Sequence, residues 1–438
     1  MTRNDPRTII HHAPMSALQV LAVAITVGLN ALDGFDVVSI SFAAPGIATE
    51  WGVEQGALGI VLSMGLIGMG LGSLLIAPIA DVVGRRPLML GCLVAMTAGM
   101  FLSSSATNVY MLSLWRVITG LGIGGMLGSI NAVAAEFSSH RRRDLSVAIM
   151  SIGYPAGVVL GGLVAAMLLT SYDWRAVFIF GGIMSAIFIP LILLLLPESL
   201  SFLVQKRPTN ALGRINSILG RMGHAPLEAL LPVPDAADRG RPTDIFRKAL
   251  LPTTMVLGIA YFLHIMTFYY MQSWIPKIVV DLGFTQPQGS RVLVWANLGG
   301  AIGGAVLGGL APRFGLNALT TIVTFGTAVV VALFGMISPD LAALTAIVFV
   351  AGFFWNAAVV GFYALAARNF PTHVRATGTG FMIGFGRAGA ALAPIIAGFL
   401  FQAGLGRDVV SPIMAIGSLL GGVALFIGLR HSKAATEA

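Results

Sequence analysis

Long apolar runs recur along this chain and leave little sequence between them. A helix of about 20 apolar residues crosses a hydrocarbon core of roughly 30 Å. The composition agrees, because 56% of the 438 residues are hydrophobic and 10% are charged. The sequence therefore predicts an all-α integral membrane protein with twelve transmembrane helices, at 17–46, 57–80, 87–106, 109–135, 145–170, 175–196, 249–275, 289–311, 318–338, 342–366, 376–403 and 410–429.

The basic residues are divided unequally between the two sides of such a bundle. With a cytoplasmic N-terminus, 20 of the 26 lysines and arginines fall in cytoplasmic segments, four fall outside and two lie within spans. This split obeys the positive-inside rule. We therefore expect a multi-pass protein in the lipid bilayer with both termini cytoplasmic. The net charge of +8 reflects this topology and gives no reason to expect nucleic acid as a partner.

The two halves of the chain resemble each other. A shift of 231 residues aligns Asp33 with His264 and Pro45 with Pro276. A shift of 233 aligns a second set, in which Phe137, His140, Arg142 and Gly153 match Phe370, His373, Arg375 and Gly386. Parallel repeats imply a pseudo-twofold axis along the membrane normal and a site between the halves near the midplane.

These halves define the expected domains. They are a cytoplasmic tail at 1–16, a six-helix bundle at 17–197, a connector at 198–248, a second six-helix bundle at 249–429 and a tail at 430–438. The connector is polar and basic and is expected on the cytoplasmic face. Within it, the stretch from Thr209 to Arg221 is expected to form an amphipathic surface helix.

Four charged residues lie deep inside the apolar runs. They are Asp33 and Asp36 in the first, Arg116 in the fourth and Arg387 in the eleventh. An ionisable group at the bilayer centre costs on the order of 2.5–3.5 kcal/mol even by insertion scales. Such groups therefore face a bundle interior or a polar cavity, and these four indicate a functional site.

Specific motifs add a family resemblance. The segment Gly72 to Arg86, GSLLIAPIADVVGRR, resembles the signature between the second and third helices of the major facilitator superfamily. A second signature of that family is matched by Arg116, Gly120, Gly122 and Gly124, and Pro-Glu-Ser follows the sixth span at Pro197 to Ser199. The resemblance covers the whole chain and implies the major facilitator fold of two six-helix bundles.

A narrower resemblance lies in the first span. The segment Leu32 to Ile47, LDGFDVVSISFAAPGI, is similar to the Asp-Gly-Phe-Asp signature of the aromatic acid:proton symporters, and FYYMQSWIPK (Phe268 to Lys277) and FPTHVRATGTG (Phe370 to Gly380) are further matches. The resemblance implies a symporter of the bacterial cytoplasmic (inner) membrane that imports benzoate or 4-hydroxybenzoate for aromatic catabolism. Its partners are a small aromatic carboxylate and a proton, and its drive is the proton gradient, without a cofactor.

The two aspartates suit proton coupling. Asp33 and Asp36 are three residues apart and share one helix face. Burial and mutual repulsion raise a carboxyl pKa and a nearby arginine lowers it, so a site that opens and closes can load and release a proton. The alternative is that one aspartate only anchors the first helix by pairing with an arginine.

The two arginines are assigned by depth and neighbours. A guanidinium matches a carboxylate through a two-toothed hydrogen bond and stays charged. Arg387 is favoured for the substrate carboxylate, and the alternative is an ion pair with an aspartate. Arg116 is the favoured partner of Asp33 or Asp36 and completes the proton-coupling group, and all four are included among the substrate-binding candidates.

A ring-binding pocket needs apolar and stacking walls with few polar groups. The seventh, eighth and tenth spans supply the candidates, although single aromatic residues in such spans more often pack or face lipid. They are His264, Phe268, Tyr269, Gln272, Trp295, Asn297, Trp355, Asn356 and Tyr363.

The signature around Asp81 is expected to act as a gate at the cytoplasmic side. Its charges can pair with neighbouring helix ends only while that side is closed; the alternative is a static turn. The gating candidates are Gly72, Asp81, Gly84, Arg85, Arg86, Glu136, Arg142 and Arg375. The counterpart at Pro312 to Gly315 lacks the acid, so no symmetric second gate is expected.

Other function classes have little support. The single cysteine, Cys92, excludes an intramolecular disulfide, and no spacing of residues indicates a metal site or an enzyme nucleophile. We expect a monomeric transporter and no enzyme. Two alternatives stay open: a proton-coupled symporter of a non-aromatic acid, such as a dicarboxylate or sugar acid, and a transporter-like membrane sensor.

Overall fold

The computed structural model describes residues 5–230, 242–247, 249–371 and 374–434. Within these ranges it contains helices and no strand, and twelve helices are long and apolar enough to cross a membrane. The prediction of an all-α protein with twelve spans is confirmed. The spans are α2 (Ala17–Trp51), α3 (Gln55–Leu71, continued by η1 Gly72–Ile76, η2 Ala77–Ile79 and α4 Ala80–Val83), α5 (Arg85–Ser104), α6 (Val109–Glu136), α7 (Arg143–Leu168), α8 (Arg175–Leu195), α11 (Leu251–Asp281), α12 (Gln286–Phe314), α13 (Leu316–Met336), α14 (Leu341–Asn369), α15 (Arg375–Gln402) and α16 (Arg407–Ala434).

Several spans differ from their expected bounds, and α11, for example, continues beyond residue 275 to Asp281. Helix α2 continues beyond residue 46 to Trp51 and ends at Gly52, whose φ of 60° lies in the left-handed region that suits glycine. The second span changes from α-helix to a π turn at Gly72 and then to a 3-10 turn that contains Pro78. Proline has no amide hydrogen, so it interrupts the regular helical hydrogen bonds here.

The two halves of the chain use the same helix pairs. In the first half (α2 to α8), α2 packs on α7, α3 on α6, and α5 on α6 and α8. In the second half (α11 to α16), the corresponding pairs are α11 with α15, α12 with α14, and α13 with α14 and α16. The contacts between the halves are also paired, because α3 packs on α15 and α7 packs on α12.

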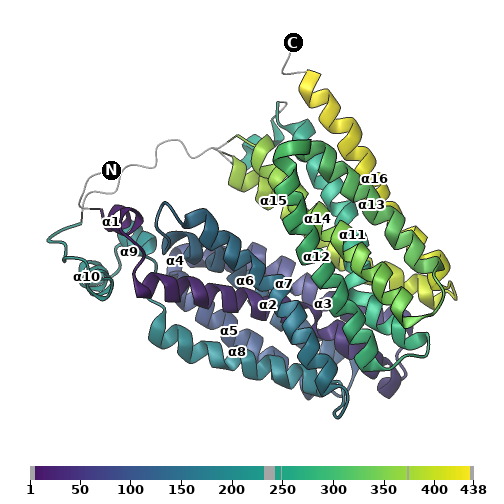
Figure 1. Cartoon of the computed structure of the whole chain (residues 1–438). Coiled ribbons are helices and arrows are strands. Elements are labelled where there is room, and N and C mark those ends of the chain that lie inside the picture. The colour runs from purple at the N-terminus through teal and green to yellow at the C-terminus, as the bar shows by residue number, and fades with distance from the viewer. Residues whose placement is uncertain (1–4, 231–241, 248, 372–373, 435–438) are drawn as a thin grey trace.

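The halves meet at one end of the molecule and diverge at the other (Figure 1). The diverging end, called here the terminal end, carries the described N-terminal residues and the end of α16. At the opposite end, called the distal end, Gln402 donates a hydrogen bond to Glu54 across the halves, with Nε2 and Oε2 2.5 Å apart. Beside it, a Cβ on Gly398 would lie 3.1 Å from Cα of Gly59, so the helix backbones approach closely.

The ion pairs of the spans do not take part in this contact. Arg85 pairs with Glu136, Arg175 with Glu50, and Lys277 with Asp281, each inside one half. No ion pair between described residues of the twelve spans joins the two halves.

Shorter helices lie outside the spans. They are α1 (Pro6–His12), α9 (Leu200–Lys206), α10 (Ala211–Arg221) and η3 (Pro242–Phe246). Helix α10 begins two residues after Thr209 because Asn210 is in the left-handed region, with φ 60°, and it buries Ile215, Ile218 and Leu219. Residues 1–4, 231–241 and 435–438 of the expected tails and connector, and His373 of the repeat, lie outside the described residues.

Tight helix crossings use glycine inside each half. A Cβ on Gly157 would lie 1.8 Å from the carbonyl oxygen of Ala31, where α7 crosses α2. A Cβ on Gly352 would lie equally close, 1.8 Å, to the carbonyl oxygen of Ala296, where α14 crosses α12. Any side chain at these positions forces the helices apart.

We predict that Gly157→Leu lowers the thermal stability of the purified protein in detergent, because overpacking costs about 1–3 kcal/mol and here meets backbone atoms. Gly91→Leu is the matched control, since a Cβ on Gly91 meets no atom within 4 Å. Equal melting temperatures for the two variants would contradict the close α2–α7 crossing.

Candidate functional site

Arg387 of α15 lies where the two halves meet. Its Nη1 is 3.9 Å from the sulfur of Met69 on α3, which belongs to the other half. Its charge acts on Tyr154, Tyr261, Tyr269 and Tyr363 and on Asp33. Arg387 forms no ion pair within 4 Å with any acid that the structure describes. A half-buried guanidinium with free donors therefore faces the interface.

Tyrosines from three helices surround this guanidinium. The hydroxyls of Tyr261 on α11 and Tyr363 on α14 are 3.1 Å apart. Tyr269, also on α11, interacts through its hydroxyl with Arg387 and with Tyr154 of α7, so this contact crosses the halves. Tyr269 and Tyr363 are candidates from the sequence, whereas Tyr154 and Tyr261 were missed. Tyr261 precedes His264 by three residues on one helix face, and that spacing is the signal that could have found it.

Asp33 and Asp36 lie inside the first half, on α2. Their exposed fractions are 1% and 0%, and their carboxylate oxygens have no hydrogen-bond partner among the described residues. Asp33 lies in the field of Arg387 across the interface, and Asp36 in the field of Arg116. A buried carboxylate without partners is costly as an anion, which favours the protonated form unless a cation approaches.

Arg116 is bound to the helix that carries both aspartates. Its Nη2 donates to the main-chain oxygen of Asp36 at 2.7 Å, and its Nη1 donates to the hydroxyl of Ser39 at 3.2 Å. The guanidinium also lies over the ring of Phe178, 5.6 Å from the centroid. The structure thus brings Arg116 to Asp36, but through the main chain and not through the carboxylate.

The other pocket candidates fall into two groups. Phe268 lies against Tyr269 and Trp355, with ring centroids 5.0 and 5.7 Å apart, and these rings adjoin the tyrosines. Gln272 and Asn297 bond to each other through their amides, at 3.2 and 3.3 Å. The two groups both include residues of α11, which carries Phe268, Tyr269 and Gln272.

The remaining candidates lie elsewhere or are already bonded. His264 is held between the hydroxyl of Ser418 and the main-chain oxygen of Trp355, at 2.9 and 3.0 Å. Asn356 donates to the main-chain oxygen of Gly300 at 2.8 Å. Trp295 of α12 is 46% exposed and lies on the same side of this helix as Ile302, which is also exposed.

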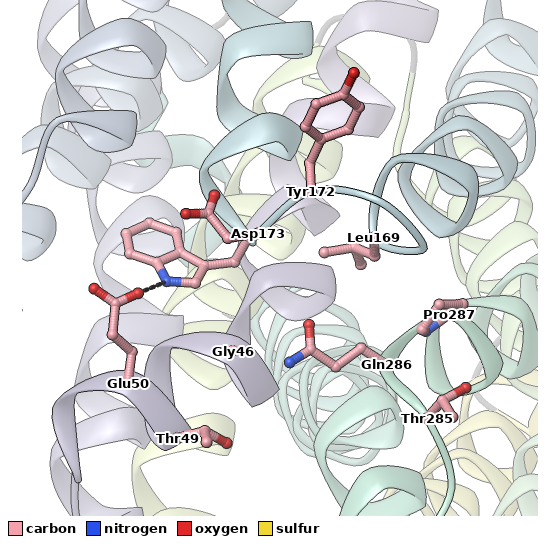
Figure 2. Close-up of a pocket in the computed structure, with 10 residues that line it drawn as sticks. Gly46, Thr49, Glu50, Leu169, Tyr172, Asp173, Thr285, Gln286 and Pro287 are labelled. Atoms are coloured by element: carbon pink, nitrogen blue, oxygen red, sulfur yellow. Dashed lines mark hydrogen bonds between the residues drawn. The ribbon is translucent and has the colours of Figure 1, made fainter.

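A separate cavity opens at the distal end (Figure 2). It has a volume of about 430 Å³ and includes neither Arg387 nor the two aspartates. Its walls come from both halves: Gly46, Thr49, Glu50, Leu169, Tyr172, Asp173 and Trp174 from the first, and Thr285, Gln286 and Pro287 from the second.

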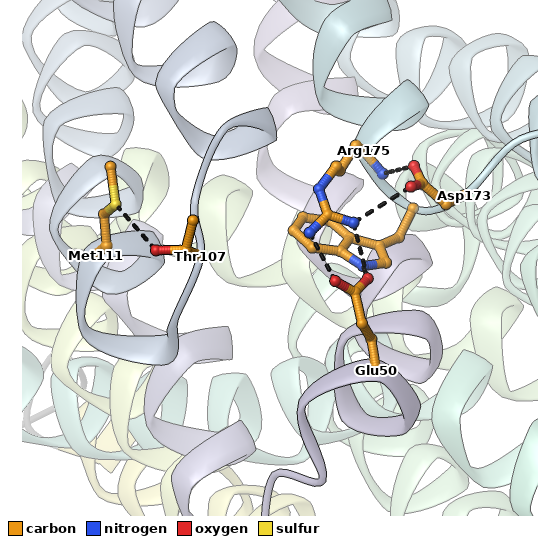
Figure 3. Close-up of polar contacts among 6 residues, drawn as sticks. Glu50, Thr107, Met111, Asp173 and Arg175 are labelled. Atoms are coloured by element: carbon orange, nitrogen blue, oxygen red, sulfur yellow. Dashed lines mark hydrogen bonds and ion pairs between the residues drawn. The ribbon is translucent and has the colours of Figure 1, made fainter.

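One wall of this cavity is fixed by a charge cluster (Figure 3). Arg175 donates to both carboxylate oxygens of Glu50 at 2.7 Å, and Nε1 of Trp174 donates to Glu50 at 2.7 Å. Asp173 accepts from the same arginine at 3.2 Å. On a neighbouring turn, the hydroxyl of Thr107 approaches the sulfur of Met111. The cluster joins the ends of α2 and α8 within the first half.

A second charge cluster lies at the terminal end of the first half. Arg85 pairs with Glu136 at 2.8 Å, and Ser199 donates to the same carboxylate. The side chain of Glu198, 3% exposed, accepts from the main-chain N–H groups of Arg85 and Arg86 at 3.0 and 3.3 Å. Glu198 thereby caps α5 at its positive end. Its role was missed, although Pro-Glu-Ser after the sixth span is the signal.

The other gating candidates have fewer contacts. Asp81 is exposed and forms no ion pair with a described residue. Gly72 opens the π turn, Arg142 precedes α7, and Arg375 donates to the main-chain oxygen of Phe370 at 3.4 Å. Gly84 has φ 102° and leaves no room for a Cβ, which would lie 2.4 Å from Glu198. The described residues contain no group of three His, Cys, Asp or Glu side chains that could hold a metal.

Comparison of the sequence with known proteins identifies the family of this chain. The sequence pattern of the Major Facilitator Superfamily matches residues 26–394 and, in a second match, 257–438. A gallate transporter of Pseudomonas putida is 28% identical over 99% of this chain and 97% of its own. A 4-hydroxybenzoate transporter of the same organism is 29% identical over 97% and 95%. A benzoate transport protein of Acinetobacter baylyi is 27% identical over 90% and 86%.

Solved structures agree on the fold. The nucleoside transporter NupG superimposes with a TM-score of 0.71 at 14% identity, covering 94% of this chain and 99% of that one. The inward-open xylose transporter XylE from E. coli gives 0.68 at 18% identity, covering 92% and 94%. With its twelve spans and a family pattern along its whole length, the chain belongs to the Major Facilitator Superfamily and is a multi-pass membrane transporter, not an enzyme.

Proposed function

We propose that this transporter imports a small aromatic carboxylate together with a proton, by alternating access between the two halves. The observation that carries the proposal is the guanidinium of Arg387, which lies at the interface without an ion-pair partner among the described residues and within a group of tyrosines. A carboxylate is the anion whose two oxygens match a guanidinium best.

The surroundings of Arg387 suit a ring. The hydroxyl of Tyr269 interacts with Arg387, and its ring packs against Phe268, which in turn packs against Trp355. Such edge-to-face ring pairs contribute about 0.5–1.5 kcal/mol beyond burial. The relatives named for gallate, 4-hydroxybenzoate and benzoate support the same substrate class. A dicarboxylate would require a second free cation, and the other intramembrane arginine, Arg116, is occupied by the main chain of α2.

The proton completes the charge balance. Moving a monoanion inward against a negative-inside potential costs about 2.3 kcal/mol per 100 mV, and a co-transported proton cancels that charge. Asp33 faces Arg387 across the interface, so a substrate carboxylate that neutralises Arg387 removes the cation that favours the ionised aspartate. Binding of the acid and protonation of Asp33 therefore favour each other. Proton-driven import needs no cofactor.

The orientation follows from the basic residues. In the bacterial cytoplasmic membrane the positive-inside rule places both termini in the cytoplasm. The terminal end, at which the halves diverge in Figure 1, then faces the cytoplasm. Asp81, exposed in this open form, is the proposed partner for a group of the second half in the closed form. The protein is proposed to act as a monomer in the lipid bilayer.

Removal of the guanidinium tests the carboxylate site. Hydrogen bonds to charged groups contribute about 1.5–3 kcal/mol, so Arg387→Ala is expected to weaken benzoate binding roughly 10- to 100-fold. Benzamide, which lacks the charge, should bind wild type and variant alike. Arg387→Lys keeps the charge without the two-toothed geometry and should be intermediate, and Arg291→Ala, an exposed arginine, is the control. Equal loss for benzoate and benzamide would remove the assigned role.

Neutral amides at the aspartates test the coupling. In proteoliposomes, Asp33→Asn is expected to abolish uptake driven by a pH gradient and to retain exchange of substrate for substrate, because exchange requires no net proton movement. Asp36→Asn is measured beside it, and Asp408→Asn is the exposed control. Gradient-driven accumulation by the Asp33→Asn variant at the wild-type level would contradict the proposed role of Asp33 in proton coupling.

The cap at Glu198 gives a separate prediction for the terminal end. Glu198→Ala leaves two part-buried N–H groups of α5 without their acceptor, and the loss of such a hydrogen bond costs about 0.5–1.5 kcal/mol. The variant should melt several degrees below wild type in a thermal-shift assay. Glu228→Ala, at an exposed position, should not. A wild-type melting temperature for Glu198→Ala would show that the cap does not stabilise the fold.

A further inference from the structure

Arg387 can bind a carboxylate without the hydroxyl pair of Tyr261 and Tyr363, so this pair calls for a separate explanation. The two oxygens are 3.1 Å apart, both residues belong to the second half, and both lie in the field of Arg387. Each phenol carries one donor hydrogen and can also accept. Their mutual bond uses one hydrogen, and neither hydroxyl has another hydrogen-bond partner among the described residues. One donor and further acceptor capacity therefore remain.

The two rings differ in how firmly they are held. Tyr261 is 4% exposed and meets Phe362 edge-on, with centroids 5.5 Å apart. It lies directly on α15, where a Cβ on Gly386 would be 2.4 Å from its ring. Tyr363 is 40% exposed. The pair thus joins a fixed phenol to one that is open to a ligand.

A neighbouring tyrosine has a hydroxyl that is fully buried and already hydrogen-bonded. Tyr270 is also on α11, but it is 0% exposed and its hydroxyl bonds to that of Ser411 at 2.7 Å. No open side remains there for a third group. Tyr363 therefore differs from Tyr270, because its position leaves it partly exposed.

The pair also keeps its place relative to Arg387. Tyr269 contacts Tyr154 across the two halves, so that contact changes when the halves move. Tyr261, Tyr363 and Arg387 all belong to the second half and are expected to move together. A ligand held by all three keeps the same partners while the halves move.

Building on the proposed function, we infer that Tyr261 and Tyr363 form a hydroxyl-recognition pair that selects ring acids carrying a phenolic hydroxyl over the unsubstituted ring acid. The carboxylate binds Arg387, and the ring hydroxyl donates to one tyrosine oxygen and accepts from the other. A ligand without the hydroxyl leaves the remaining donor of the pair unpaired, and this loss is the source of discrimination.

Binding of benzoate and of its three monohydroxy isomers to the full-length protein tests the inference. A neutral hydrogen bond corresponds to roughly 3- to 10-fold in affinity, so wild type should prefer one hydroxy isomer over benzoate by at least about that factor. Tyr363→Phe should abolish this preference, because the hydroxy isomer loses more affinity than benzoate does. Tyr261→Phe should act in the same way, and the more exposed Tyr363 provides the test if the Tyr261 variant does not fold.

Tyr270→Phe is the matched control and should affect all four acids equally. An unchanged preference in Tyr363→Phe, or an equal loss for benzoate and the hydroxy isomer, would overturn the hydroxyl-recognition role while the carboxylate site stands. Failure of wild type to bind any of the four acids would instead overturn the proposed function itself.

Discussion

A guanidinium at the interface of two helix bundles, without an ion-pair partner among the described residues, has to be stabilised there by other groups. Arg387 meets this constraint through surrounding phenols, a facing aspartate on the other half and partial exposure to the interface. An arginine buried in hydrocarbon without such neighbours would be costly. The close packing of α15 on α3 and α11, which glycine permits, places this charge at the junction of the halves.

The second intramembrane arginine shows the contrasting solution. Arg116 is 1% exposed and donates hydrogen bonds to the main-chain oxygen of Asp36, to the hydroxyl of Ser39 and to the sulfur of Met100. Both of its terminal nitrogens are bonded inside one half, and these bonds hold it against α2. Placing either arginine in the bilayer costs a similar free energy. Arg116 stabilises the position of a helix, whereas Arg387 remains available to a ligand.

The sequence predicts the twelve spans and the four intramembrane charges because apolar length and isolated charge are local signals. Periodicity brings Arg116 near α2, but it cannot tell whether the guanidinium meets a carboxylate or a carbonyl. The aromatic candidates are harder to predict, since a ring in a span has the same local pattern whether it packs, faces outward or lines a site. Trp295 and Tyr363 are both partly exposed, and only the packing of α12 and α14 separates them. Tyr154 and Glu198 depend on contacts between distant segments.

The placement of the ion pairs has a consequence for how the halves exchange states. Arg85–Glu136, Arg175–Glu50 and Lys277–Asp281 each stay within one half, and the distal contact of the halves consists of an amide–carboxylate bond and close backbone. Salt weakens the attraction between solvent-exposed charges and largely screens it beyond a Debye length, about 8 Å at physiological ionic strength. In the proposed cycle none of these pairs has to break when the halves separate, so salt would change the balance between the forms through the proposed contact of Asp81 and not through them. In the proposed mechanism the balance responds above all to the buried charges of Asp33 and Arg387, which would bind the proton and the substrate.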